Sequence, residues 1–300
     1  MLKRTLVIET AGHLTLKQGQ LNIVYSDVDK AGNTVPIEDL GILILENSHC
    51  TVSNALLANL AENNVVVVHC GGNKMPIAFT MPVQANTLFS QRLQQQTTVT
   101  LALQKNLWQQ TIKAKIKNQR LHLQHWQIPC LKMKQWEEAV FSGDSQNHES
   151  RAAAFYWSQI TGIPGFVRDP EGFAPNALLN YGYAILRAIT ARSLVGSGLH
   201  PSLGIFHRNK YNAYCLADDI MEPYRPAVDW LVRSMLEQGT DCDFLGKEQK
   251  QQLLQLPVMN VKIEGKVSPL LVAMSRTTAS LADCYAGKRK LVRFPEMMFK

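Results

Sequence analysis

The hydrophobic pattern of this chain changes once, between residues 81 and 88. Before that point, apolar residues occur in short runs rich in β-branched side chains, and turn sequences such as "KQGQ" and "CGGNK" separate them. One helix is predicted among these strands, in "TVSNALLANLAENN", with Thr51 or Ser53 as its N-cap. The predicted strands are "TLVIE", "HLTLKQ", "LNIVYS", "GILILE" and "VVVVHC".

After the change the pattern is helical. Residues 88–126 contain no Pro or Gly, and their apolar positions recur at helical spacing. Further helices are predicted at 130–142, 145–161, 175–195, 223–238, 246–255 and 268–286. A chain of 300 residues is long enough for two domains. The sequence therefore predicts an α+β protein with a small β-rich domain at 1–84 and a larger all-α domain at 85–300.

Composition narrows the class of protein. Apolar residues make up 46% and charged residues 18%, which is typical of a folded soluble chain. The longest apolar run, "VVVV", is far too short to cross a bilayer, and the N-terminus lacks the apolar core of a signal peptide. A cytoplasmic protein with no membrane partner is expected. The six cysteines are scattered without a C-x-x-C pair, which argues against a zinc ribbon or a disulfide scaffold.

Positive charge is concentrated in the second part of the chain. Residues 1–86 hold five basic and seven acidic residues, whereas the remainder holds 26 basic and 17 acidic ones. A polyanion such as nucleic acid is the natural partner for the helical part, and a merely basic surface is the alternative.

The stretch "LADDIMEPYRP" at 216–226 gathers three carboxylates, Asp218, Asp219 and Glu222. One interpretation is a helix start, with an Asp cap and acidic residues in the first turn. The other is a divalent-metal site, because Asp219 and Glu222 are three residues apart and Mg²⁺ or Mn²⁺ prefers carboxylate oxygens.

Two other stretches contain residues that suit such a site. "SQNHESRAAAFYW" places Glu149 in a predicted first turn, after Ser145 or Asn147 as the cap, where a carboxylate could equally compensate the helix dipole. "GLHPSLGIFHRNKYN" places His207 where an apolar run meets a basic loop. The pair in "HLQH" at 122–125 is interpreted as surface.

Taken together, "HESRAAAFYW", "LGIFHRN" and "DDIMEPYRP" have the order and spacing of a known family. The chain resembles the CRISPR-associated adaptation integrase, the larger core subunit that inserts new spacers into a CRISPR array. The type II variety is the nearest in "GLHPSLGIFHRNKYNAYCLADDIMEPYRP". The resemblance covers nearly the whole chain. It implies that Glu149, His207 and Glu222 hold Mg²⁺ or Mn²⁺, and that Asp219 helps to bind metal or orients a water.

The activity implied is metal-assisted phosphoryl transfer on DNA. A 3′-hydroxyl of the incoming fragment would attack a phosphodiester at the repeat border, and water in its place would make the same site an endonuclease. A non-catalytic DNA-binding scaffold and a general metal-dependent nuclease are the alternatives.

Several side chains near the predicted ligands are candidates for contacts with DNA, and solvated surface is the alternative for the basic ones. The tail "KRKLVRF" at 288–294 could grip DNA, dock a partner or be disordered. The candidate contacts are Arg208, Lys210, Arg225, Arg187 and Arg192, with Tyr156 expected beside the phosphate.

The resemblance also implies partners. They are double-stranded DNA as spacer precursor and repeat, a second copy of the chain paired through the β-rich domain, and a small ferredoxin-like adaptation protein. For the type II variety they include a ring-forming DNA-end protein and the effector nuclease.

Overall fold

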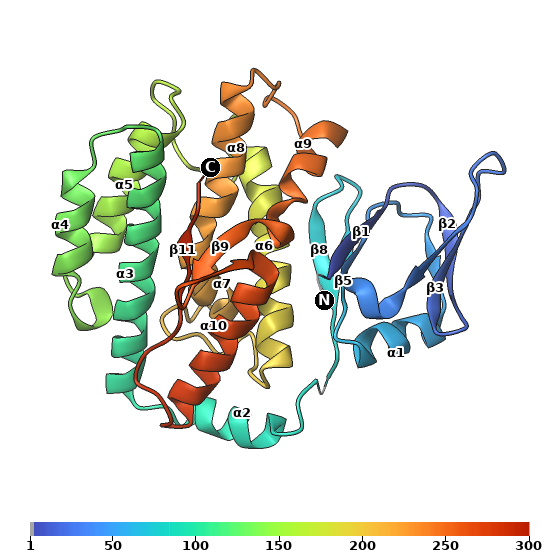
Figure 1. The fold of residues 1–300 in the computed structure, drawn as a ribbon, viewed down its shortest axis with the longest axis horizontal. Coiled ribbons are helices and arrows are strands. Elements are labelled where there is room, and N and C mark those ends of the chain that lie inside the picture. The colour runs from blue at the N-terminus through green and yellow to red at the C-terminus, as the bar shows by residue number, and fades with distance from the viewer. Residues whose placement is uncertain (1–2, 84, 300) are drawn as a thin grey trace.

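The computed structural model describes residues 3–83 and 85–299. Its first part is built from two sheets (Figure 1). Strands β1, β5 and β7 are parallel and β8 is antiparallel, in the order β1-β5-β7-β8, while the second sheet has the order β4-β3-β2-β6. The elements are β1 (Arg4–Ile8), β2 (Gly12–Lys17), β3 (Gln20–Tyr25), β4 (Asn33–Pro36), η1 (Ile37–Asp39), β5 (Leu40–Leu45), β6 (Thr51–Val52), α1 (Asn54–Glu62), β7 (Val66–Cys70) and β8 (Pro76–Thr80).

The strands β5 and β7 are apolar without alternation because both faces of their sheet are covered. Leu43 and Val67 belong to the core between the two sheets and α1. Ile44 and Val68, one residue further along each strand, belong to the core of the helical part. The two parts of the chain therefore share a sheet whose side chains contribute to both cores.

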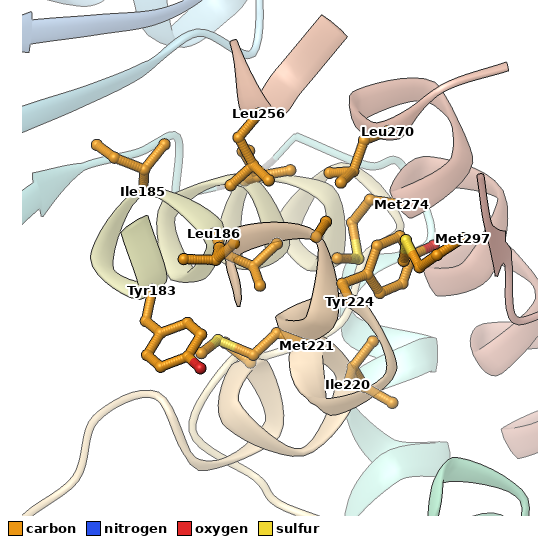
Figure 2. Packing of buried hydrophobic residues seen from close by; sticks show 14 of the residues in the cluster. Tyr183, Ile185, Leu186, Ile220, Met221, Tyr224, Leu256, Leu270, Met274 and Met297 are labelled. Atoms are coloured by element: carbon orange, nitrogen blue, oxygen red, sulfur yellow. The ribbon is translucent and has the colours of Figure 1, made fainter. Parts of the chain in front are cut away.

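The second part is mostly helical, with α6 at its centre (Figure 1). Helices α7, α8, α9 and α10 pack around α6, and their buried side chains belong to one core. Figure 2 shows the part of this core where side chains of α6, α7 and α10 meet. The elements are α2 (Phe89–Thr97), α3 (Leu101–His125), α4 (Leu131–Ala139), η2 (Ser142–Asp144), α5 (His148–Ile160), α6 (Asn176–Gly196), α7 (Cys215–Met221), η3 (Glu222–Tyr224), α8 (Arg225–Glu237), α9 (Lys247–Leu253), η4 (Leu256–Val258), β9 (Asn260–Ile263), β10 (Lys266–Pro269), α10 (Leu270–Tyr285) and β11 (Glu296–Met297).

The α+β class, with strands first and helices after, is confirmed. The five predicted strands form, and Ser53 is the cap of α1, since its side chain accepts a hydrogen bond from the backbone N–H of Leu56. The helical stretch 88–126 divides into two helices, because the Thr100 hydroxyl caps α3 through the N–H of Leu103.

A three-stranded sheet, β10-β9-β11, lies inside the part predicted to be all helical. Its strands have two to four residues, too few for an alternating pattern to be recognised, and β11 pairs with a strand more than thirty residues earlier. The tail before β11 packs against α3 and α10 rather than being disordered. Gln110 on α3 bonds Val292 N–H and the Lys290 carbonyl, and Ser280 on α10 accepts from Arg293 N–H.

Among the described residues, no helix is both long and apolar enough to cross a membrane.

A buried ion pair joins the two parts of the chain. Lys250 Nζ on α9 lies 2.8 Å from Glu46 Oε1, which follows β5, and both side chains are nearly inaccessible. Lys74 reaches the same oxygen at 3.3 Å from a largely exposed position. Because an unpaired buried carboxylate is costly, this pair holds α9 against the sheet.

Replacing Lys250 with Met should lower the free energy of unfolding by about 3 kcal/mol, since it leaves Glu46 with only the exposed Lys74. Urea denaturation measures the change. Lys247→Met is the matched control, because Lys247 is exposed and lies 3.8 Å from Glu9, so its loss should cost less than about 1 kcal/mol. Equal midpoints for the two variants would contradict a structural role for the buried pair.

Candidate functional site

The acidic stretch does not start a helix. Helix α7 begins at Cys215, so Asp218 and Asp219 are its fourth and fifth residues, and Glu222 begins the following turn η3. All three carboxylates are buried. The predicted Asp cap is therefore wrong, since Tyr214 and Met221 hold the N-cap positions, whereas Asp218 and Glu222 do lie in first turns. Each acid has another partner. Asp218 forms a two-point ion pair with Arg187 on α6, at 2.7 and 3.1 Å.

Asp219 organises the loop that carries His207. Its carboxylate, with no exposed surface, accepts hydrogen bonds from the N–H groups of Ile205 (2.6 Å) and Phe206 (2.9 Å). The loop turns tightly at Gly204, where a Cβ atom would lie 2.2 Å from the His207 carbonyl oxygen. Asp219 thus positions the loop and has no free face for a metal, which corrects its predicted part in metal binding.

The same carboxylate orients the imidazole. His207 Nδ1 lies 2.5 Å from Asp219 Oδ1, which leaves Nε2 as the ring nitrogen available to a ligand. This hydrogen bond raises the pKa of His207 above its ordinary value; burial opposes the shift, and the charges of Glu222 and Glu149 add to it. The charges of both glutamates thus favour the protonated imidazole.

Glu149 and Glu222 meet at a lysine that was not predicted. Lys115 Nζ, from the middle of α3, lies 2.7 Å from Glu149 Oε1 and 2.7 Å from Glu222 Oε2. Glu222 Oε1 also lies 3.2 Å from Arg225 Nε. Burial alone would raise the pKa of Glu222, but Arg225 and Lys115 hold it below its usual value.

The charge of Lys115 follows from the same contacts. Burial alone would lower its pKa, but Glu222 and Glu149 raise it above the ordinary value. A sequence signal existed, because Lys115 interrupts the buried face of α3 that includes Thr111 and Ile112. A buried lysine on such a face requires a carboxylate partner.

Two side chains fix the segments that carry the glutamates. Asn147, one of the two predicted caps, is the N-cap residue of α5, but its side chain forms no capping hydrogen bond; the Asp144 carboxylate accepts from the N–H groups of His148 and Glu149 instead, both at 2.9 Å. Asn118, one turn after Lys115 on α3, is fully buried. Its amide donates to the Pro223 carbonyl (2.7 Å) in the turn of Glu222 and to the Pro295 carbonyl (3.0 Å) in the tail.

The predicted basic residues fall in different places. Arg208 and Lys210 are exposed and line a cavity of about 470 Å³ beside His207. Arg187 and Arg225 line another cavity of about 470 Å³, where Arg225 lies over the Tyr183 ring at 4.7 Å. Contacts of these four residues with DNA remain predictions.

Two of the predicted DNA contacts are wrong, because the side chains lie in the interior. Arg192 is only 8% exposed, and its Nε donates to the Asn64 carbonyl at 2.6 Å. Tyr156 has no exposed surface, and its hydroxyl donates to Asp229 Oδ2 at 2.9 Å. His122, predicted at the surface, is also buried, with its Nδ1 2.7 Å from the Tyr156 hydroxyl.

The structure thus brings Glu149 and Glu222 together through one ammonium group, and places His207 near them. Across residues 3–83 and 85–299, no three His, Cys, Asp or Glu side chains converge closely enough to share an ion in this arrangement. The chemical types are nevertheless those that a hard divalent ion binds, with an imidazole oriented by a carboxylate behind it.

The family described as "CRISPR associated protein Cas1" matches residues 6–256. The "CRISPR-associated endonuclease Cas1" of Neisseria meningitidis serogroup C (strain 8013) is 33% identical over 301 residues, covering 99% of this chain and 97% of that protein.

Two solved structures share the fold. A casposase bound to an integration product has a TM-score of 0.80 at 19% identity, covering 99% of this chain and 95% of that one. A chain of a partial Cas6-RT-Cas1–Cas2 complex has a TM-score of 0.65 at 18% identity, covering 99% of this chain and all of that one.

Replacing Asp219 with Asn should lower the pKa of His207, because the hydrogen bond to Asp219 is the largest cause of its raised value. NMR titration of the imidazole C–H signals measures the change, with the exposed Asp243→Asn as control. An unchanged His207 pKa in Asp219→Asn would show that the carboxylate does not set the charge of the imidazole.

Asp229 should give the protein a defined pH dependence. Burial raises its pKa to about 6, although hydrogen bonds from Tyr183 and Tyr156 oppose the shift. The folded state then binds an extra proton between about pH 4 and pH 6, so stability falls as pH rises through that window, by about 3 kcal/mol. Relative to Asp229→Asn, the unmodified protein should lose this amount in urea titrations from pH 3 to pH 7. A pH-independent difference would refute the assignment, and the exposed Asp29→Asn serves as control.

Proposed function

Because the chain belongs to the Cas1 family of CRISPR-associated proteins, we propose that it is a DNA endonuclease and integrase that inserts spacer DNA into a CRISPR array. The observation that supports this most directly is the convergence of Glu149 and Glu222 on one cationic group, Lys115 Nζ, beside an imidazole oriented by Asp219. Three segments far apart in sequence build this arrangement.

We propose that Mg²⁺ or Mn²⁺ is held by Glu149, Glu222 and Nε2 of His207. The donor set fits a hard divalent ion, since carboxylate oxygens are its preferred ligands and imidazole is acceptable to Mn²⁺. A second observation supports the fit. Glu222 Oε2 is buried, and the ammonium group of Lys115 lies 2.7 Å from it, so a cation already stands where the ion would bind. When bound, the ion would lower the pKa of the attacking hydroxyl and neutralise charge on the phosphate.

The reaction exchanges one phosphodiester for another. The oxygen of a 3′-hydroxyl forms a bond to phosphorus, the bond from phosphorus to the 3′-oxygen of the target strand breaks, and that oxygen leaves with a proton as a new 3′-hydroxyl. With water as the attacking group the same exchange is hydrolysis. The chain's own residues would orient the groups, with Arg208 and Lys210 binding phosphates at the cavity beside His207.

The proposed partners follow from the relatives. A similar chain is part of a Cas1–Cas2 complex, and we propose that this chain likewise binds a small Cas2-type partner and double-stranded DNA. Pairing of two copies through residues 1–84, cytoplasmic action, the type II assignment, and contact with a DNA-end ring protein and an effector nuclease are further parts of the proposal.

The test mixes the protein and its small partner with a labelled duplex ending in 3′-hydroxyls and a supercoiled plasmid bearing the repeat. Label should enter the plasmid with Mn²⁺ and not with EDTA. Glu149→Ala should reduce joining by about 100-fold or more, because several kcal/mol of transition-state stabilisation are lost, while DNA binding persists.

The exposed Glu138→Ala is the matched control and should join like the unmodified protein. Cutting without joining would favour a general nuclease, and binding without either reaction would favour a scaffold. Joining that survives Glu149→Ala would refute the assigned site.

A further inference from the structure

Lys115 takes the position between the two glutamates that a bound cation would need. Its ammonium group is 2.7 Å from an oxygen of each carboxylate, and its side chain is only 10% exposed. The helix α3 that carries it is fixed one turn later by the buried Asn118, so the backbone cannot readily withdraw. The contact is therefore a built part of the site rather than a surface ion pair.

The charges explain why a lysine is present. Glu222 is buried and Glu149 is partly buried, with its side chain 23% exposed, and two neighbouring carboxylates with so little access to water need a positive charge between them. Lys115 supplies one positive charge to both, and Arg225 supplies another to Glu222 from the opposite oxygen. The ion-paired cluster of these four side chains is accordingly close to neutral.

A divalent ion bound to the same oxygens would compete with the ammonium. Positive charges a few ångströms apart repel strongly at a site with little water. Occupation by metal therefore requires the Lys115 ammonium to turn away from at least one glutamate, and a turned ammonium needs a new anion. A DNA phosphate that the proposed reaction brings to the two glutamates is such an anion.

We propose that Lys115 is a displaceable counterion that makes metal binding by Glu149 and Glu222 dependent on DNA. This inference rests on the proposed function. Without DNA the ammonium competes for the carboxylates and keeps the metal weakly bound. With DNA it transfers to a phosphate, and metal and nucleic acid each strengthen the binding of the other.

The first test is Mn²⁺ binding without DNA, measured by isothermal titration calorimetry. Lys115→Met should bind Mn²⁺ about tenfold or more tightly than the unmodified protein, because the competing charge is gone. Lys113→Met, on the same helix two residues away, should bind like the unmodified protein. In EDTA, Lys115→Met should melt at a lower temperature, and Mn²⁺ should raise its melting temperature more than that of the unmodified protein.

Lys115→Arg keeps the test decisive if Lys115→Met does not fold. A guanidinium keeps the charge and can bond both carboxylates through separate N–H groups, so Mn²⁺ should bind more weakly than in the unmodified protein. Equal or tighter binding in Lys115→Arg, or equal or weaker binding in Lys115→Met, would overturn the inference.

The second test measures coupling through DNA affinity. Fluorescence anisotropy of a labelled duplex, with Mn²⁺ and with EDTA, should show that Mn²⁺ tightens DNA binding by the unmodified protein about tenfold, and less in Lys115→Met. Equal tightening in both would overturn the coupling.

Failure of the inference and failure of the proposed function are distinguishable. If Mn²⁺ binding depends on Glu149 but is indifferent to Lys115, only the inference fails. If Mn²⁺ binds neither the unmodified protein nor any variant, the proposed metal site fails as well.

Discussion

Burial of negative charge is the constraint on which this site depends. The segment from α7 into η3 passes through the interior, so each of its carboxylates must have a donor. Asp218 forms an ion pair with Arg187, and Asp219 accepts hydrogen bonds from backbone N–H groups of the His207 loop. Glu222 forms ion pairs with Lys115 and Arg225. Through these partners one short segment fixes the positions of α6, a loop and α3. The contacts that neutralise these buried carboxylates are therefore the same contacts that bring the site residues together.

Much of the fold was predictable because its signals are local. Strands such as β5 and helices such as α6 have apolar patterns that neighbouring residues alone determine. The sheet β10-β9-β11 was not predictable, since its pairing depends on contacts distant in sequence. The unbroken apolar runs of β5 and β7 indicate that both faces of their sheet are buried. The sequence of the strands does not tell which elements cover each face.

The site was predicted in part for the same reason. Glu149, His207 and Glu222 were proposed as ligands because their surrounding motifs resemble a family; membership of that family is established, and the ligand roles stay predictions. Tyr156 and Arg192 were placed wrongly, because spacing along a helix does not tell which face is covered. The ion pairs of Lys115 were not predicted, because its partners lie 34 and 107 positions further along the chain.

The link made by Asn118 bears on the order in which the protein is made. This side chain ties α3 to the turn of Glu222 and to the segment at 295–297, which leaves the ribosome after every other described element. Helix α3 therefore emerges long before the strand that completes its anchoring. Until residues 295–297 have been made, Lys115 and the two glutamates lack this support, so the described arrangement forms only after synthesis has passed that segment.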